Sequence, residues 1–308
     1  MGNNRLKKIK YIMNKIKIIT DSEDVHLIKR ASNINDEEDI SLCCGENDVN
    51  NLEYGFHVDE TCNSKNITHI DLRDYDTSNV SDMSYMFTQF NVQSLDCSNF
   101  NTSNVITMLG MFCGCKKLTK LSVDGFDTNN VKDMSFMFGG CDELEKIDLS
   151  NFDTSNVSLM HRMFSLCYNL NSINLNNFDT SRVRRMDYMF NGCSKLDRLD
   201  LSSFTCNKVE ITDKMFLGCR NLLFIDLSNF NTENIIDASY MFSGCEKLEC
   251  INLNKFNLKN VIHCRNLFDG CISLKKIRCT REFKEWCLRN QRRIALEISS
   301  DFKWDLID

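Results

Sequence analysis

The sequence predicts an α/β repeat solenoid: a right-handed superhelix with one parallel sheet along one side, short helices or helical turns along another, and a cap at each end. Three observations predict this fold. The dipeptide Met-Phe recurs from Met86-Phe87 onward, spaced by 25 residues once and then by 26 residues six times, with Leu267-Phe268 as its last member. From the second repeat on, Cys follows Met by four positions and Leu follows Cys by three. Beyond that Leu, polar and apolar residues alternate, which is the period of a half-buried strand.

The unusual composition comes mostly from this repeat. The chain has 308 residues, with 17 Cys, 14 Met, 21 Phe and no Pro, and the repeat columns hold 12 of the Met and 15 of the Phe. A chain that is 42% hydrophobic and 26% charged is globular rather than disordered. The net charge of -6 does not suit a nucleic-acid partner. No apolar stretch reaches the roughly 18 residues that a transmembrane helix needs.

The first half of each repeat has the spacing of a helix or of tight helical turns. Apolar residues separated by 3, 3, 1, 3 and 3 positions fall on one face; in one repeat they are Val131, Met134, Met137, Phe138, Cys141 and Leu144. The preceding Asp-Thr-Ser-Asn, at 153–156 for example, offers side-chain oxygens for an N-cap. The Gly before most column cysteines suits a helix end with positive φ.

The second half of each repeat predicts a strand, as in Lys146-Ile147-Asp148-Leu149. Nine such strands are expected, from 70–72 to 277–279. Residues 1–66 and 280–308 lack the period, so the domain organisation is an N-terminal segment or cap (1–66), a solenoid of about eight repeats (67–279) and a C-terminal cap (280–308). In the last segment, Thr280 is placed to cap a helix that carries Phe283, Trp286 and Cys287.

One long motif recurs through the solenoid. It reads Ile147-Asp148-Leu149-Ser150-Asn151-Phe152-Asp153-Thr154-Ser155-Asn156-Val157, with Asp133-Met134-Ser135-Phe136-Met137-Phe138 as the second part of the unit. Over about residues 67–280 this motif resembles the BspA-like leucine-rich-repeat family in its Mycoplasma-type surface-protein form. The ending TREFKEWCLRNQ…FKWDLID also resembles the family's C-terminal cap. The resemblance implies a leucine-rich-repeat-like solenoid that presents a binding surface, and many members are predicted surface proteins or adhesins.

The chain departs from that pattern inside three of its repeats. Thr212, Ala238 and Cys264 stand where the first Met of the unit is expected, and Thr205-Cys206 replaces Asp-Thr.

The outward positions of the strands are the candidate partner-binding site. Acidic and basic side chains recur there on one face, and the candidate residues are Asp71, Asp96, Lys120, Lys146, Asp148, Arg198, Asp200, Asp226 and Lys276. One interpretation is that the two signs pair with each other in water, where each exposed pair contributes about 0–1 kcal/mol. The other is that a macromolecular partner binds this regular strip.

The seven-cysteine column is expected to pack as part of the core. Its members are Cys115, Cys141, Cys167, Cys193, Cys219, Cys245 and Cys271. Stacked side chains point in parallel, whereas disulfides and tetrahedral metal sites need converging sulfurs. Free Cys is also among the most buried residue types. His161 and His263 lack partners at ligand spacing and are expected at the surface or internally hydrogen-bonded.

An enzyme is not expected, and neither are a cofactor or a metal. The sequence has no G-x-S-x-G, Walker loop, H-E-x-x-H or G-x-G-x-x-G motif. The alternative is a catalytic site confined to the first 66 residues, where the candidates are His26, Cys43, Cys44, His57 and Cys62.

Residues 1–20 carry six basic residues and no acidic one, and Leu6, Ile9, Ile12, Met13 and Ile16 fall on one helical face. Such a helix either covers the first repeat or lies on an anionic membrane. The N-terminus lacks the apolar run of a secretory signal peptide, which favours a cytoplasmic or other reducing location over the cell surface.

The sequence therefore predicts a monomeric, non-enzymatic solenoid for protein–protein interaction, whose partner could be a host or cell-surface protein. A surface-exposed or exported adhesin or virulence factor is the alternative, and it differs in compartment more than in chemistry.

Overall fold

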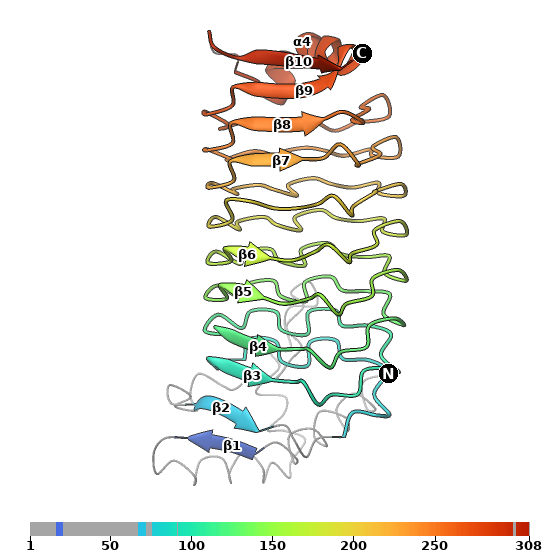
Figure 1. The fold of residues 1–308 in the computed structure, drawn as a ribbon, viewed down its shortest axis with the longest axis vertical. Coiled ribbons are helices and arrows are strands. Elements are labelled where there is room, and N and C mark those ends of the chain that lie inside the picture. The colour runs from blue at the N-terminus through green and yellow to red at the C-terminus, as the bar shows by residue number, and fades with distance from the viewer. Residues whose placement is uncertain (1–16, 21–66, 72–75, 91, 298–299, 308) are drawn as a thin grey trace, which may run out of the picture.

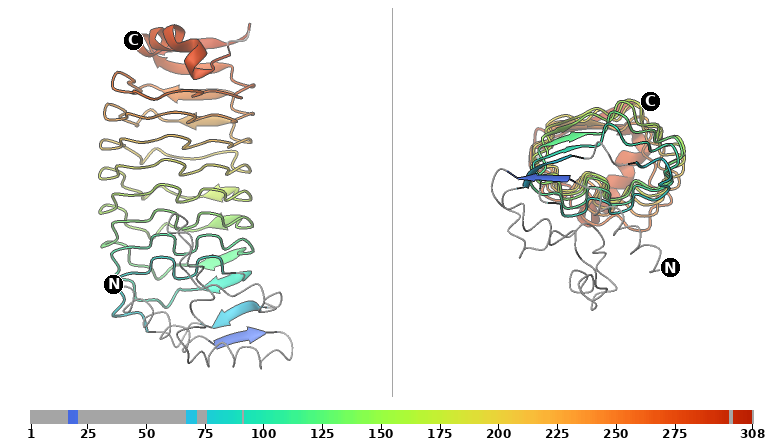
Figure 2. Two further views of the ribbon diagram at one scale, coloured as in Figure 1. Left: turned by 180° about the vertical axis from the view of Figure 1, so that it is seen from behind. Right: turned by 90° about the horizontal axis from the view of Figure 1, so that it is seen from below.

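The chain winds into a stack of turns, one turn for each 26-residue repeat (Figure 1). The computed structural model describes residues 17–20, 67–71, 76–90, 92–297 and 300–307. Viewed along the stack, the turns nearly superimpose (Figure 2). Each column of the sequence repeat therefore becomes a line of side chains that runs along the solenoid.

Short parallel strands occupy one side of the turns. They are β2 (Ile67–Asp71), β3 (Ser94–Asp96), β4 (Lys120–Ser122), β5 (Lys146–Ile147), β6 (Ser172–Ile173), β7 (Phe224–Asp226), β8 (Cys250–Leu253) and β9 (Lys276–Thr280). The pairs β3–β4, β5–β6, β7–β8 and β8–β9 are parallel, and equivalent residues of successive repeats face each other, as Ile225, Ile251 and Ile277 do. The parallel strands and the 26-residue register are as the sequence predicts.

Two features of this side differ from the prediction. Residues 199–201, expected as a strand, are not in one, although Leu223 N–H donates to the Asp197 carbonyl at 3.1 Å as the equivalent residues do in neighbouring repeats. At the other end, β1 (Lys17–Thr20) pairs antiparallel with β2. The helix expected over the N-terminal 20 residues therefore does not include 17–20. Residues 1–16, and with them the amphipathic face, lie outside the described residues.

The opposite side of each turn is built from tight turns, one of the two forms expected there, and the repeats of the described residues contain no helix. Backbone N–H groups alternate between two acceptors there. Met137 N–H bonds back to the Met134 carbonyl at 3.2 Å, whereas Phe138 N–H bonds to the Met163 carbonyl of the next turn at 2.9 Å. The apolar spacing fits both a helix and these turns, because both bring residues three apart onto one face.

Positive φ angles explain the alternation. Phe136 (φ 57°) and Gly140 (φ 73°) reverse the chain direction locally, so that alternate N–H groups point along the stack. A second parallel ladder results, with single bridges from Asp82 to Thr107, then to Asp133 and onward to His263. The sequence predicts positive φ for the Gly column. In the column of Phe136 and Tyr188 the signal is weak: Gly110 and Asn266 suit this conformation, whereas large residues rarely adopt it.

The N-cap expectation was wrong in the same way, since no helix follows the Asp-Thr-Ser-Asn segment. Instead, Asp153 Oδ1 accepts from Ser155 N–H at 2.9 Å, which closes a turn. The buried Thr154 hydroxyl donates to the Asp179 carbonyl of the next turn at 3.0 Å. These polar residues thus tie successive turns together.

The core lies inside the stack and consists of stacked aromatic columns with Met, Cys and Leu between them. Phe112, Phe138, Phe164, Phe190 and Phe216 form part of one column, with ring centroids 5.5–5.8 Å apart. Their planes are within 9° of parallel. Ring stacking of this kind adds to the free energy gained by burying the side chains.

After the last repeat come helix α4 (Arg281–Ile294) and strand β10 (Lys303–Ile307). Thr280 is the N-cap of α4, as predicted, and its Oγ1 accepts from Phe283 N–H at 3.2 Å. The helix buries Phe283, Cys287 and Ile294, while β10 pairs parallel with β9.

Candidate functional site

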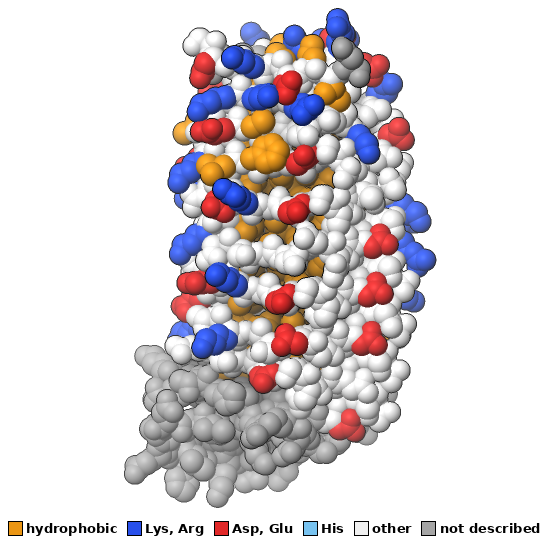
Figure 3. Space-filling model, in the orientation of Figure 1, with side chains coloured by type: hydrophobic (Ala, Val, Ile, Leu, Met, Phe, Trp, Pro, Cys, Tyr) orange, Lys and Arg blue, Asp and Glu red, His pale blue; other side chains and the backbone are white. Residues whose placement is uncertain are grey.

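The candidate side chains form two exposed columns on the outward sheet face. The basic column contains Lys120, Lys146, Arg198 and Lys276, and the acidic column contains Asp96, Asp148, Asp200 and Asp226. Figure 3 shows blue and red side chains in separate lines along this face, with hydrophobic side chains visible between them. Asp71 lies in β2, and its side chain is outside the described part of the chain. The alternation in the sequence thus places these residues on one face as expected.

The expected pairing of opposite charges is wrong for the central residues of this face. In the described part of the chain, no ion pair joins Lys146 or Arg198 to Asp148, Asp200 or Asp226. The carboxylates are held by the backbone instead, since each closes the turn that follows its strand. Asp148 Oδ1 accepts from Ser150 N–H at 2.9 Å, and the same bond recurs at Asp200 and Asp226.

These hydrogen bonds lower the pKa of Asp148 and of Asp200, because donors to a carboxylate favour its charged form. The carboxylates therefore stay ionised at neutral pH. Lys276 is different: it pairs with Asp305 of β10 at 2.8 Å. The face thus presents fixed negative charges beside the exposed basic side chains of Lys146 and Arg198.

A hollow of about 520 Å³ interrupts this face where residues 199–201 leave the sheet. Its lining includes Arg198, Asp200, Leu223, Phe224 and Asp226. Leu223 and Phe224 are 42% and 47% exposed, which is unusual for large apolar side chains next to a charged column. We call this the β7 hollow. The sequence signal for it is Phe224 in a column that holds Lys or Arg in four other repeats, and the sequence analysis did not single it out.

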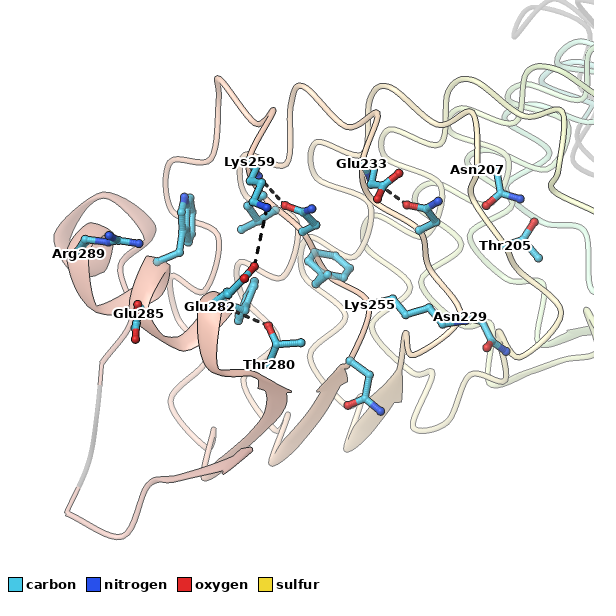
Figure 4. Close-up of a pocket in the computed structure, with 17 residues that line it drawn as sticks. Thr205, Asn207, Asn229, Glu233, Lys255, Lys259, Thr280, Glu282, Glu285 and Arg289 are labelled. Atoms are coloured by element: carbon cyan, nitrogen blue, oxygen red, sulfur yellow. Dashed lines mark hydrogen bonds and ion pairs between the residues drawn. The ribbon is translucent and has the colours of Figure 1, made fainter. Parts of the chain in front are cut away.

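A larger hollow, of about 740 Å³, lies between the Asn-rich turns of the last repeats and helix α4 (Figure 4). Lys259 and Glu282 approach each other across it at 3.9 Å. Part of its polar lining has partners: Asn229 Nδ2 donates to the Ser202 carbonyl, and Asn257 Oδ1 accepts from Lys259 N–H. Two buried oxygens of the lining, Thr205 Oγ1 and Asn254 Oδ1, have none. Its lining includes none of the exposed large apolar side chains that the β7 hollow has, so it is the weaker candidate for a protein partner.

A ladder of cations and aromatic rings, which the sequence analysis did not identify, lies on the side of the tight turns. The Arg162 guanidinium is 5.3 Å from the Phe136 ring centroid and 4.3 Å from that of Tyr188. Lys214 Nζ lies 4.7 Å from the Tyr188 centroid and 5.5 Å from that of Tyr240. Each contact of this type contributes about 0.5–1 kcal/mol at exposed sites, so the ladder stabilises the stack.

The two histidines are placed as expected. His161 Nδ1 lies 2.8 Å from the Ser135 hydroxyl, its ring packs edge-on against Phe136 at 5.2 Å, and burial lowers its pKa. His263 is exposed.

Among the described residues, no group of three or more His, Cys, Asp or Glu is positioned to hold a metal ion. The candidates for a catalytic site within the first 66 residues all fall outside the described part of the chain; they are His26, Cys43, Cys44, His57 and Cys62.

The cysteine column is buried, as predicted, and it also forms a hydrogen-bonded ladder. Each thiol donates to the carbonyl of a Phe in the preceding turn; Cys167, for example, donates to Phe138 at 3.0 Å and Cys193 to Phe164 at 3.1 Å. Burial raises the pKa of Cys167 and of Cys219 to about 12. These thiols hold turns together and are poorly suited to nucleophilic chemistry.

Thiol labelling tests this assignment. Treating the native protein with N-ethylmaleimide at about pH 8 should leave Cys167 and Cys219 unlabelled in peptide mass spectra, because a pKa of about 12 leaves more than about a thousandfold fewer thiolates than a free Cys has. Half-buried Cys113 is the internal control and should react sooner. All should label in guanidinium chloride. Native labelling of the column at the rate of Cys113 would contradict the assignment.

No helix among the described residues is long and apolar enough to span a membrane. The comparison with curated proteins returned no significant match. A crystal structure of a leucine-rich repeat protein from Bacteroides ovatus ATCC 8483 is similar at 16% identity, with 73% of this chain and 86% of that chain covered and a TM-score of 0.18. The family described as "Mycoplasma protein of unknown function, DUF285" matches residues 50–147, 119–222, 140–249 and 199–295. These matches cover most of the chain and confirm the resemblance in the repeat motif, so the chain belongs to this Mycoplasma repeat family.

Proposed function

We propose that the protein is a non-enzymatic interaction solenoid that binds a protein partner through the outward sheet face. The β7 hollow is the observation that carries this proposal. It combines the exposed apolar side chains Leu223 and Phe224 with the charges of Arg198, Asp200 and Asp226. An apolar anchor within a polar rim is the usual composition of an interface hot spot.

The chemistry of the partner follows from the two columns. An apolar side chain would fill the β7 hollow, acidic groups would meet Lys146 and Arg198, and basic groups would meet Asp148 and Asp200. Such complementarity sets the orientation and the rate of association. A rigid stack of turns holds these groups at fixed spacing, so little ordering is needed on binding.

Site-specific photo-crosslinking tests the proposal. A photoreactive phenylalanine analogue in place of Phe224, in the full chain expressed in its source cell, should capture a defined protein. The matched control carries the analogue at Ile272, which is 76% exposed and lies on another part of the turn. The same capture from both positions, or none from Phe224, would contradict the proposal.

Phe224→Lys gives the quantitative prediction. It restores the basic residue found in the equivalent position of other repeats, so the fold should tolerate it. Losing an interface anchor costs about 2 kcal/mol or more, so affinity for the captured partner should fall about 30-fold or more. Binding is measured by titration with that partner, and Ile262→Lys, at an exposed position outside the hollow, should change it less than about threefold. Unchanged affinity in Phe224→Lys would exclude this hollow.

The alternative function is a surface or exported adhesin, which the family resemblance favours and which the same face could serve. Membrane contact through residues 1–20 belongs with this alternative. Counting free thiols in protein from its native source separates the compartments: close to all 17 Cys free indicates a reducing interior, whereas several disulfides indicate export.

We also propose that residues 280–308 cap the solenoid. Helix α4 buries Phe283 and Ile294 at the last turn, and Phe283 packs edge-on against Phe256 at 6.1 Å. A terminal repeat without such a cover would expose its apolar face.

A further inference from the structure

Strand β10 leaves one edge of the sheet unoccupied among the described residues. The strand order is β10-β9-β8-β7, so β10 has a neighbour on one side (Figure 1). Lys303 N–H donates to the Lys275 carbonyl at 2.7 Å, which directs the backbone of residue 303 toward β9. Because successive residues of a strand alternate in direction, the N–H and C=O groups of Trp304 and Leu306 point away from β9. Such an edge is a template for a further strand.

We infer that this edge pairs with the same edge of a second copy of the chain, antiparallel and centred on Trp304. The sequence Phe302-Lys303-Trp304-Asp305-Leu306 is self-complementary about its middle residue. In that register Lys303 of each copy faces Asp305 of the other, and Phe302 faces Leu306. Opposite charges directly across an antiparallel pair stabilise it.

The neighbouring registers are unfavourable by the same rule. Centring the pair on Asp305 would place the two Asp305 carboxylates opposite each other, and centring it on Lys303 would do the same for two ammonium groups. Like charges directly opposite destabilise a strand pair. Charge therefore selects one register.

The hydrogen-bonding directions fit this register as well. The outward backbone groups of Trp304 face those of Trp304 in the second copy, and the outward groups of Leu306 face those of Phe302. Lys303 and Asp305, whose backbone groups serve β9, then form the closer pair without hydrogen bonds. The ladder between β9 and β10 stays intact.

The side chains at this edge also have surface to bury. Leu306 is 37% exposed, while Phe302 and Trp304 are half-buried and pack edge-on at 5.2 Å. Asp305 already lies 2.8 Å from Lys276 and 3.9 Å from Arg278. Lys303 of the second copy would approach this carboxylate from its open side. The contact is the same for both copies, so it closes at two and forms no filament.

The sequence alone favours a monomer, whereas the open edge of β10 favours a dimer. Sedimentation of the full chain at about 100 μM should give twice the 35.8 kDa of one chain if the dissociation constant is micromolar or tighter. Leu306→Pro removes an N–H that points outward and leaves the β9 ladder, so it should weaken the dimer about tenfold or more. Leu306→Thr keeps that N–H and should weaken it less than Leu306→Pro does.

A charge exchange tests the register. Lys303→Asp and Asp305→Lys should each be monomeric alone, because each places like charges across the pair. Mixing the two variants should restore a heterodimer, since both cross-strand pairs are then opposite in sign. A monomeric wild type, a dimer that survives Leu306→Pro, or variants that fail to associate on mixing would each overturn the inference. Circular dichroism of each variant confirms that the solenoid itself is folded.

Discussion

Phe190→Ala should lower the free energy of unfolding by about 3–5 kcal/mol, the range measured for removing a buried Phe from a core. Phe190 is fully buried and stacks on two rings, Phe164 at 5.6 Å and Phe216 at 5.7 Å. The substitution leaves a cavity and removes both stacking contacts. Because turns on either side are rigidly in register, neither neighbour can move into the space without breaking its own column.

Urea denaturation measures this effect, and the solenoid provides a matched control. Phe224→Ala makes the same chemical change at an exposed position and should cost less than about 1 kcal/mol. Phe190→Leu should fall between the two, since it retains most of the apolar volume. If Phe190→Ala and Phe224→Ala had similar urea midpoints, the aromatic column would not be a main source of stability.

The repeat made the fold predictable because each column of the sequence has one environment in every turn. The Phe and Cys columns are buried and the strand charges are exposed, as the periodicity indicates. The spacing could not distinguish a helix from turns, because both place residues three apart on one face. The deciding feature is the positive φ of Phe136 and its equivalents, which Gly110 and Asn266 signal in two repeats and the large residues of the other repeats do not.

The candidate face was predictable in position but not in its energetics. Alternation put Lys146 and Asp148 on the same side of the sheet, yet only the structure shows that the carboxylate serves the following turn. The β7 hollow depends on where residues 199–201 leave the ladder, a property of the local backbone. The available signal was Phe224 at a position where four other repeats have Lys or Arg, so single departures from a repeat are worth weighing as candidate contacts.

Deleting residues 281–308 should open the C-terminal end of the stack and leave its middle intact. The deletion removes α4 with Phe283 and Ile294, and with it the strand that pairs with β9. Burying each of these two side chains contributes about 1.5–3 kcal/mol, so losing both costs about 3–6 kcal/mol, which is comparable to the lower end of the ~5–15 kcal/mol that stabilises a typical domain. In a solenoid this loss falls on the nearest turns, because each turn contacts only its neighbours.

Hydrogen exchange read by mass spectrometry separates local from global effects. Amides of β8 and β9 should exchange about 100-fold faster or more in the truncated chain, while those of β5 and β6 should stay within about threefold of the full chain. Thr280→Ala, which removes the N-cap of α4, provides a milder variant worth about 1 kcal/mol and should affect the same amides less. Protection of β9 that survives the deletion would show that the segment is not a cap, whereas uniform loss along the chain would show that the turns fold as one cooperative unit.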